Sequence, residues 1–150
     1  MKGRAKSTAG KEVLTLAGYS GTPLATKLGI KSGTTLATLN APDGYDSLLE
    51  PIPANIRKVA TVSQRTDIVH LFVTSRAVLT AQLQRCLQKM RADTVIWVSW
   101  PKKAAKVATD VTEDAIRAVA LPLGLVDIKV CAVDATWSGL KLVIRKENRR

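Results

Sequence analysis

The sequence predicts an α/β fold in which a mostly parallel sheet ends in an antiparallel hairpin. Three observations lead to this prediction. Residues 67–73 form an almost continuous apolar run, which is typical of a mid-sheet strand covered on both faces. Residues 75–90 place apolar side chains at helical spacing, and residues 95–100 form another strand of the buried type. Strands that alternate with helices in this way favour a parallel sheet with right-handed crossovers.

The front half of the chain predicts smaller elements. The first is a short helix that Thr22 caps, with Pro23 at its first position and Gly29 directly after its end. A first core strand over residues 34–40, a helical turn over 46–50 and a second strand over 56–62 follow. The segment 41–45, Ala-Pro-Asp-Gly-Tyr, is typical of a turn after the first strand.

The back half is more regular. Ser75 is expected to cap the first long helix. The next helix starts near Asp110 or Thr112, and Glu113 lies three positions after Asp110, as a reciprocal cap requires. Two strands, 125–133 and 140–145, then close the chain through a turn over 134–139, which the side chain of Asp134 can cap.

Length and composition bound the class of protein. With 150 residues, 46% of them hydrophobic, the chain can bury one core, so we expect a single domain over 19–146 between basic tails at 1–18 and 147–150. No apolar run is long enough to span a membrane and no signal core is visible, so the default location is cytoplasmic. Cys86 and Cys131 are expected to be separate core residues, and with one histidine they supply no zinc ligand set.

The net charge of +11 favours phosphate-rich partners. Lys2, Arg4 and Lys6 belong to the N-terminal tail, where basic residues aid solubility or adhere to nucleic acid without specificity. A second group follows the strand over 95–100, and open α/β sheets bind their ligands at such strand ends. This group consists of Lys102, Lys103 and Lys106.

The carboxyl ends of the parallel strands are expected to meet in one cleft where the strand order reverses. Ammonium groups and loop donors in such a cleft suit an anion, such as a phosphate. The alternative is that the lysines form only a solvated loop. The predicted ligand-binding residues are Asn40, Asp43, Gly44, Tyr45, Thr74, Ser75, Ser99, Trp100, Lys102 and Lys103.

The aromatic residues and the single histidine divide into two groups. His70 lies within an apolar run, so we expect a core histidine bonded to a neighbour rather than a catalytic base. Trp97 is expected in the core. Trp100 and Trp137 adjoin turns and basic residues, which suits stacking on a single-stranded nucleic acid, although core packing is the alternative for both. No set of nucleophile, base and orienting residue is evident.

The succession of elements from 67 to 145 resembles the C-terminal half of a class I S-adenosylmethionine-dependent methyltransferase, which has a Rossmann-like sheet. Nearly the whole chain is also similar to a family of small bacterial proteins of unassigned function with a reduced version of that fold. The stretches that carry this second resemblance are GYSGTPL (18–24), LNAP (39–42), HLFVTS (70–75), VSWPK (98–102) and TWSGLK (136–141).

The methyltransferase resemblance implies S-adenosylmethionine as cofactor, held by a Gly-x-Gly loop after the first strand and by an acidic residue at the end of the second. Here the first strand leads into residues 39–44, which contain one glycine and a proline. The second strand, near 59–62, ends without a carboxylate, and the span before the central strand is too short for the family's full helix and third strand. No cofactor is therefore expected.

Three functions remain. The first is a non-catalytic methyltransferase-like module that binds a phosphate-bearing ligand or nucleic acid. The second is a methyltransferase with an altered pocket for S-adenosylmethionine, and the third is a subunit that binds a protein partner. The sequence leaves the ligand and the oligomeric state open.

Overall fold

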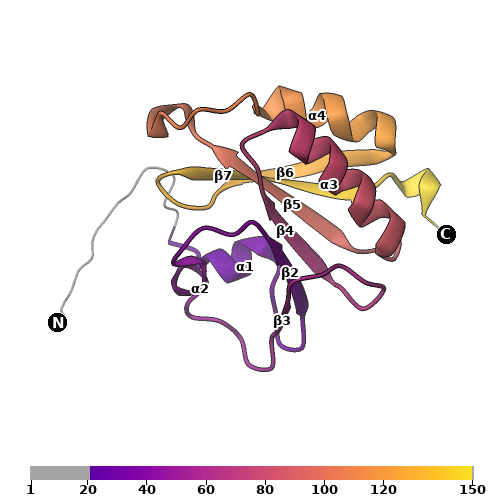
Figure 1. Ribbon diagram of the computed structural model, residues 1–150. Coiled ribbons are helices and arrows are strands. Elements are labelled where there is room, and N and C mark those ends of the chain that lie inside the picture. Colours follow the sequence, from indigo (N-terminus) through magenta and orange to yellow (C-terminus); the bar gives the residue numbers. More distant parts are fainter. Residues whose placement is uncertain (1–20, 150) are drawn as a thin grey trace.

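The computed structural model describes residues 21–149, and within them a six-stranded sheet has the order β3-β2-β4-β5-β7-β6 (Figure 1). Its strands are β2 (Thr35–Leu39), β3 (Arg57–Val59), β4 (Ile68–Phe72), β5 (Val95–Pro101), β6 (Leu125–Ala132) and β7 (Trp137–Ile144). The α-helices of this part of the chain are α1 (Leu24–Leu28), α2 (Tyr45–Leu48), α3 (Arg76–Lys89) and α4 (Glu113–Ala120).

The sheet has the predicted topology. β3, β2, β4 and β5 are parallel, and β7 runs antiparallel between β5 and β6. The chain passes from β2 outward to β3 and then returns to the other side of β2 as β4, so the strand order reverses between β2 and β4. The expectations of an α/β class, a mostly parallel sheet and a C-terminal antiparallel hairpin are confirmed.

Helices cover both faces of the sheet, because successive side chains of each strand point to opposite faces (Figure 1). On one face, Val69 and Leu71 of β4 pack with Leu83 of α3 and with α4. On the other face, Phe72 of β4 and Trp97 of β5 pack with α1 and Tyr45. All five residues of β4 are buried, which confirms a mid-sheet strand covered on both sides.

Side-chain caps begin both long helices, but one differs from the prediction. The Ser75 hydroxyl accepts the Val78 N–H at 3.3 Å, as expected. At α4 the cap is Thr112, whose hydroxyl accepts the Ala115 N–H at 3.0 Å. The reciprocal cap predicted for Asp110 is wrong: its carboxylate accepts the Arg76 N–H at 2.7 Å and so caps α3, which follows a different strand.

The C-terminal hairpin starts earlier than expected. Trp137, Ser138 and Gly139 were predicted to lie in the turn, but they belong to β7 and pair with Pro101, Trp100 and Ser99. The Asp134 carboxylate accepts the N–H groups of Thr136 and Trp137, both at 2.8 Å, so the predicted cap is present in a tighter turn. The second strand is also shorter than 56–62, since β3 is an edge strand that pairs only with β2.

The two predicted tails differ in what the structure says about them. The Arg149 guanidinium donates to the Ile144 carbonyl at 2.9 Å, and the short 3-10 turn Lys146–Asn148 lies beside Gly124. The predicted domain boundary at residue 146 stays a prediction. The N-terminal tail predicted over residues 1–18 lies outside the described residues.

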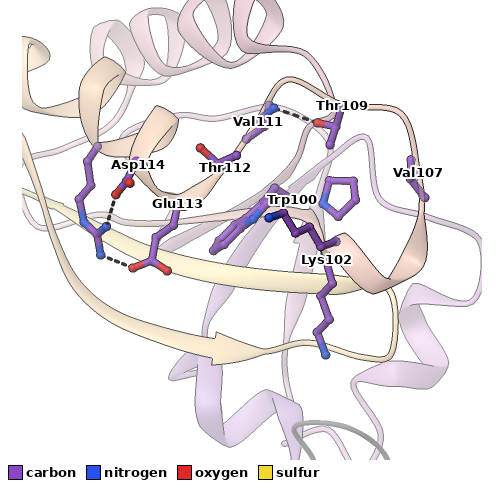
Figure 2. Close-up of a pocket in the computed structure, with 11 residues that line it drawn as sticks. Trp100, Lys102, Val107, Thr109, Val111, Thr112, Glu113 and Asp114 are labelled. Carbon is purple, nitrogen blue, oxygen red and sulfur yellow. Dashed lines mark hydrogen bonds and ion pairs between the residues drawn. The ribbon is translucent and has the colours of Figure 1, made fainter.

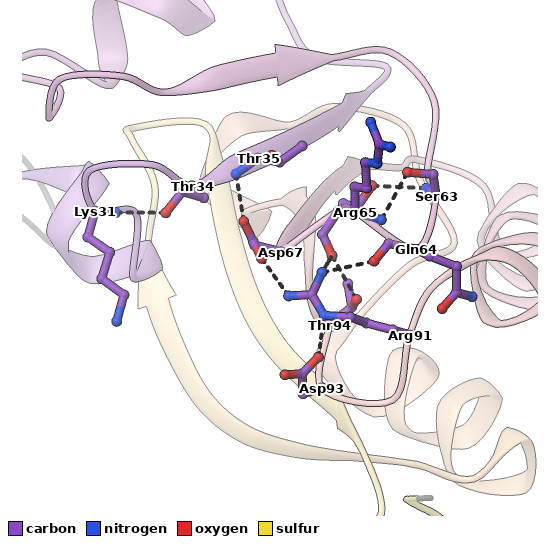
Figure 3. A network of polar contacts seen from close by, with 11 residues as sticks. Lys31, Thr34, Thr35, Ser63, Gln64, Arg65, Asp67, Arg91, Asp93 and Thr94 are labelled. Carbon is purple, nitrogen blue, oxygen red and sulfur yellow. Dashed lines mark hydrogen bonds and ion pairs between the residues drawn. The ribbon is translucent and has the colours of Figure 1, made fainter.

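A polar network joins the starts of the central strands (Figure 3). Arg91 donates to the carbonyls of Gln64 and Thr66, each at 3.0 Å, and to the carboxylates of Asp67 and Asp93. Asp67 also accepts the Thr35 N–H at 2.8 Å. Burial opposes ionisation of Asp67, but the hydrogen bonds from Thr35 and Arg91 outweigh it and lower the pKa of this carboxyl.

Candidate functional site

Two cavities open at the carboxyl edge of the sheet. One, which we call the switch-point cavity, lies where the strand order reverses and has a volume of about 310 Å³. It is lined by Asn40, Phe72, Val73, Thr74, Ser75, Val78 and Trp137. The other, which we call the β5–α4 cavity, has a volume of about 650 Å³ and lies between the end of β5 and the start of α4. Open α/β sheets bind ligands at this edge.

The predicted single cleft is therefore divided. Asn40, Thr74 and Ser75 line the switch-point cavity, whereas Trp100, Lys102 and Lys103 line the β5–α4 cavity. The two sets are separated because Trp137, which starts β7, pairs with Pro101, and the Lys102 N–H donates to the Thr136 carbonyl at 2.7 Å. The lysines do not face Asn40 across one rim, which corrects the sequence-based expectation.

The loop after β2 adopts a left-handed backbone at two positions. Asn40 has a φ of 61° and Gly44 a φ of 82°. Asparagine tolerates this region better than most residues with a side chain, and glycine occupies it without strain. Asp43 and Gly44 are exposed and line neither cavity, so of the predicted loop residues only Asn40 faces one.

Tyr45 and Ser99 lie in the core rather than on a rim, which corrects their predicted placement. The Tyr45 hydroxyl lies 2.8 Å from Nδ1 of His70, and the Ser99 hydroxyl lies 2.7 Å from Nε2 of the same ring. His70 and Ser99 are 0% exposed and Tyr45 is 5% exposed. Burial lowers the pKa of His70 to about 3 and raises that of Tyr45. The expectation of a bonded core histidine is confirmed.

The walls of the β5–α4 cavity combine apolar groups with charges (Figure 2). Trp100, Val107 and Val111 form the apolar part. Arg117 donates to Asp127 at 2.9 Å, to Asp114 at 3.1 Å and to Glu113, and the hydrogen bond to Asp127 contributes most to the raised pKa of its guanidinium. Lys102 and Lys103 are the other two cations of the lining.

The two tryptophans with predicted stacking roles differ. Trp100 is 9% exposed and packs among residues of α3 and α4, so it is mainly a core residue. Trp137 is half-buried and lines the switch-point cavity, and its ring contacts that of Phe72 edge-to-face with 5.0 Å between the ring centroids. Trp97 is 0% exposed, as predicted. Among the predicted nucleic-acid contacts, Lys106 is exposed beside the cavity loop, while Lys2, Arg4 and Lys6 lie outside the described residues.

Sequence reasoning missed a third cavity, which we call the α3-flank cavity. Its volume is about 210 Å³, and it lies between α3 and the chain that follows β3. It is lined by Leu39, Ala60, Thr61, Val62, Gln82, Arg85, Cys86 and Lys89. The sequence signal for this cavity was the pair Arg85 and Lys89, which lie four residues apart on α3. Both lie on the polar face of the helix, where solvated charges are common.

Within residues 21–149, the Ser99 hydroxyl lies 2.7 Å from Nε2 of His70, but both residues are 0% exposed, so this pair of nucleophile and base is closed off from any substrate. His70 is sealed in the core, and burial raises the pKa of the Cys86 thiol to about 11, which disfavours the reactive thiolate. Within the same residues no group of three or more acidic, histidine or cysteine side chains could hold a metal ion. None of the helices in this range has the length and apolar character to cross a membrane.

Comparison with known proteins identifies the fold. No family model and no curated protein matches the sequence. A proposed type 11 methyltransferase from Sulfolobus solfataricus is 9% identical over 85% of this chain and 92% of its own, with a TM-score of 0.56. An S-adenosylmethionine-dependent methyltransferase from Aquifex aeolicus is 12% identical over 81% of this chain and 87% of its own, with a TM-score of 0.52. Aeropyrum pernix fibrillarin with natively bound S-adenosylmethionine is 13% identical over 80% of this chain and 73% of its own, with a TM-score of 0.51.

The protein therefore has a methyltransferase-like, Rossmann-like fold, in which the loop after β2 and the end of β3 differ from the S-adenosylmethionine site that the resemblance implies. Pro42 offers no backbone donor in the loop after β2. Ala60 and Thr61 follow β3 where the fold's carboxylate is expected. Tyr45 directs its side chain into the core. The similarity to the small bacterial family stays a prediction.

Proposed function

We propose that the protein is a non-catalytic, methyltransferase-like module that binds a phosphate-bearing ligand, as a nucleotide or within a nucleic acid, at the carboxyl edge of its sheet. The observation that carries this proposal is the set of groups at that edge. Lys102 and Lys103 line one cavity, while the amide of Asn40 and the indole of Trp137 line the next. Ammonium groups attract phosphate, and an indole face stacks on a base.

The charge balance supports the same proposal. The chain has 23 lysines and arginines against 12 acidic residues, so its field attracts polyanions before contact. The one histidine is sealed in the core, which removes the most common general base at neutral pH. The excess of positive charge and the burial of the one histidine together favour binding without catalysis.

Substituting alanine for both Lys102 and Lys103 is expected to weaken binding of a single-stranded oligonucleotide and to flatten its salt dependence. Loss of two phosphate contacts should reduce the slope of log K against log salt by about 1.4. Fluorescence anisotropy over a series of salt concentrations measures this slope. The control is the double variant Lys129→Ala/Lys146→Ala, which removes the same charge from exposed positions outside the cavities. Equal slopes in the two variants would contradict a role for the β5–α4 cavity.

Trp137→Ala is expected to weaken the same binding by about 1–3 kcal/mol, the range for loss of one base-stacking contact. Trp137→Phe retains a ring on the wall of the cavity and should keep most of the affinity. If the alanine and phenylalanine variants bind equally well, Trp137 does not stack on a base.

A methyltransferase is the competing function, since the structures similar in fold are methyltransferases and one contains natively bound S-adenosylmethionine. Calorimetric titration with S-adenosylmethionine and with S-adenosylhomocysteine separates the two. We expect no saturable heat at millimolar concentrations of either compound. Saturable binding at micromolar concentrations would replace the non-catalytic module with a transferase.

A protein-binding subunit is less favoured. The edge strand β6 does expose Ile128 and Val130, at 55% and 51%. However, Lys129 lies between them and the pairing with β7 is irregular between Asp127 and Lys129. A lysine and a bulge are common protections of an edge strand against pairing with another chain.

A further inference from the structure

We infer that the ligand is a single strand of nucleic acid, and that two consecutive nucleotides of the strand occupy the switch-point cavity and the β5–α4 cavity. This inference rests on the proposed function and deepens it by naming the class of ligand. Three features of the molecule carry it: the contacts between the two cavities, the composition of their walls and their volumes.

The two cavities adjoin each other at two pairs of residues, which we call the ridge. Trp137 of the switch-point cavity pairs with Pro101 of the β5–α4 cavity, and paired strands lie about 5 Å apart. The Thr109 hydroxyl, in the lining of the β5–α4 cavity, donates to the Thr74 carbonyl at 2.7 Å, and Thr74 lines the switch-point cavity. One ligand that crosses this ridge therefore reaches both cavities.

The walls of the switch-point cavity suit an unpaired base. Their apolar part includes Phe72, the half-buried Trp137 and Val78, which is 42% exposed. The amide of Asn40 offers a donor and an acceptor, and within residues 21–149 this amide makes no hydrogen bond. The bases of a duplex are already stacked and paired, so only a single-stranded base can present its ring and its edge to these groups.

The β5–α4 cavity combines groups that a phosphate alone does not satisfy. Lys102 and Lys103 suit the phosphate. Val107, which is 42% exposed, adds apolar surface, and Glu113 and Asp114 lie on the side of the cavity away from it (Figure 2). A carboxylate repels a phosphate but accepts hydrogen bonds from the exocyclic amino group of a base. The cavity therefore suits a phosphate that is followed by a second base.

The two volumes agree with this division. Sites that enclose a small ligand measure roughly 300–1,000 Å³. The switch-point cavity, at about 310 Å³, is at the lower end of this range and suits one nucleoside, whereas the β5–α4 cavity, at about 650 Å³, is larger than one phosphate requires. A mononucleotide with its base in the first cavity leaves most of the second empty, but a dinucleotide enters both.

The test compares adenylyl-(3′→5′)-adenosine with adenosine 5′-monophosphate. Each contains one phosphate, but at neutral pH the monoester is more negative than the diester that joins two nucleosides. Attraction to a basic surface therefore favours the mononucleotide, and only contacts with a second base favour the dinucleotide. We expect the dinucleotide to bind about tenfold more tightly, a difference of about 1.4 kcal/mol. Competition against a fluorescein-labelled single strand measures both affinities by anisotropy.

Two substitutions separate the cavities in this experiment. Val107→Ser is expected to remove most of the tenfold difference, because it replaces apolar surface beside the second base. The control Val130→Ser changes an exposed valine of β6 outside both cavities and should keep the difference. Trp137→Ala is expected to weaken both ligands by a similar factor, since each places a base in the switch-point cavity. A thermal melt of each variant checks that the fold is intact.

Three outcomes would overturn the inference. Equal or tighter binding of the mononucleotide would remove the strand and leave a nucleotide as the ligand of the proposed function. A labelled duplex of the same sequence that binds as tightly as the single strand would assign binding to the phosphate backbone, again with the proposed function intact. If the labelled strand and both small ligands fail to bind, the inference and the proposed function fall together.

Discussion

Lowering the pH from 6.5 to 4.5 is expected to reduce the free energy of unfolding by about 2 kcal/mol through His70 alone. Burial lowers the pKa of this ring from 6.5 to about 3 in the folded protein. Between these two values the unfolded chain binds a proton that the folded chain does not, so acid favours unfolding. The contribution is complete above the unfolded pKa and is lost progressively as the pH falls below it.

Urea denaturation at several pH values measures this dependence. His70 is the one histidine of the chain, so no second imidazole titrates in this range. His70→Gln removes the titrating group and is expected to flatten the dependence between pH 4.5 and 6.5, although its stability at pH 7 will be lower. Constant stability of the wild type over this range would mean that the folded protein protonates His70, in conflict with its burial between Tyr45 and Ser99.

Arg91→Ala is expected to lower the free energy of unfolding by about 2 kcal/mol, because it removes charge-assisted hydrogen bonds to two carbonyls and two carboxylates. The bond to Asp67 matters most, since Asp67 also accepts the Thr35 N–H and thereby joins the starts of β2 and β4. Arg91 is partly exposed, with a side-chain exposure of 33%, and solvent screening keeps the expected loss at this level.

Arg91→Lys is the matched variant for this prediction. It keeps the charge but cannot reproduce the planar fork of donors, so most of the loss should remain. Arg65→Ala, in the same loop region, should change stability by less than about 0.5 kcal/mol, as is usual for exposed positions. If Arg91→Lys is as stable as the wild type, charge alone accounts for the effect and the fork geometry does not.

The elements that the sequence predicted well are those whose signals are local. The apolar run around β4 and the helical spacing of α3 each describe one continuous segment, and both elements lie where they were expected. The Ser75 cap is local as well, since its partner is three residues away. The hairpin turn was less predictable, because pairing of Trp137 with Pro101 depends on a strand far away in the chain.

The candidate site was predicted less well, because a strand end indicates an edge of the sheet but not which side chains share a cavity there. Tyr45 follows the loop after β2, where an exposed rim was expected, yet its hydroxyl bonds to His70 in the core. Lys102 and Asn40 belong to the same edge, but the start of β7 lies between their cavities. The α3-flank cavity requires α3 to lie against residues 60–62, which helical spacing cannot reveal.

By itself, then, the sequence determined the fold class, the central strands, the main helices and the strongly basic character of the protein, because periodicity and composition belong to the chain alone. Only the tertiary structure decided that Asp110 caps α3, that Ser99 seals His70, and that Arg85 faces the chain after β3. Each of these contacts joins residues from separate elements, and its geometry depends on how those elements pack together.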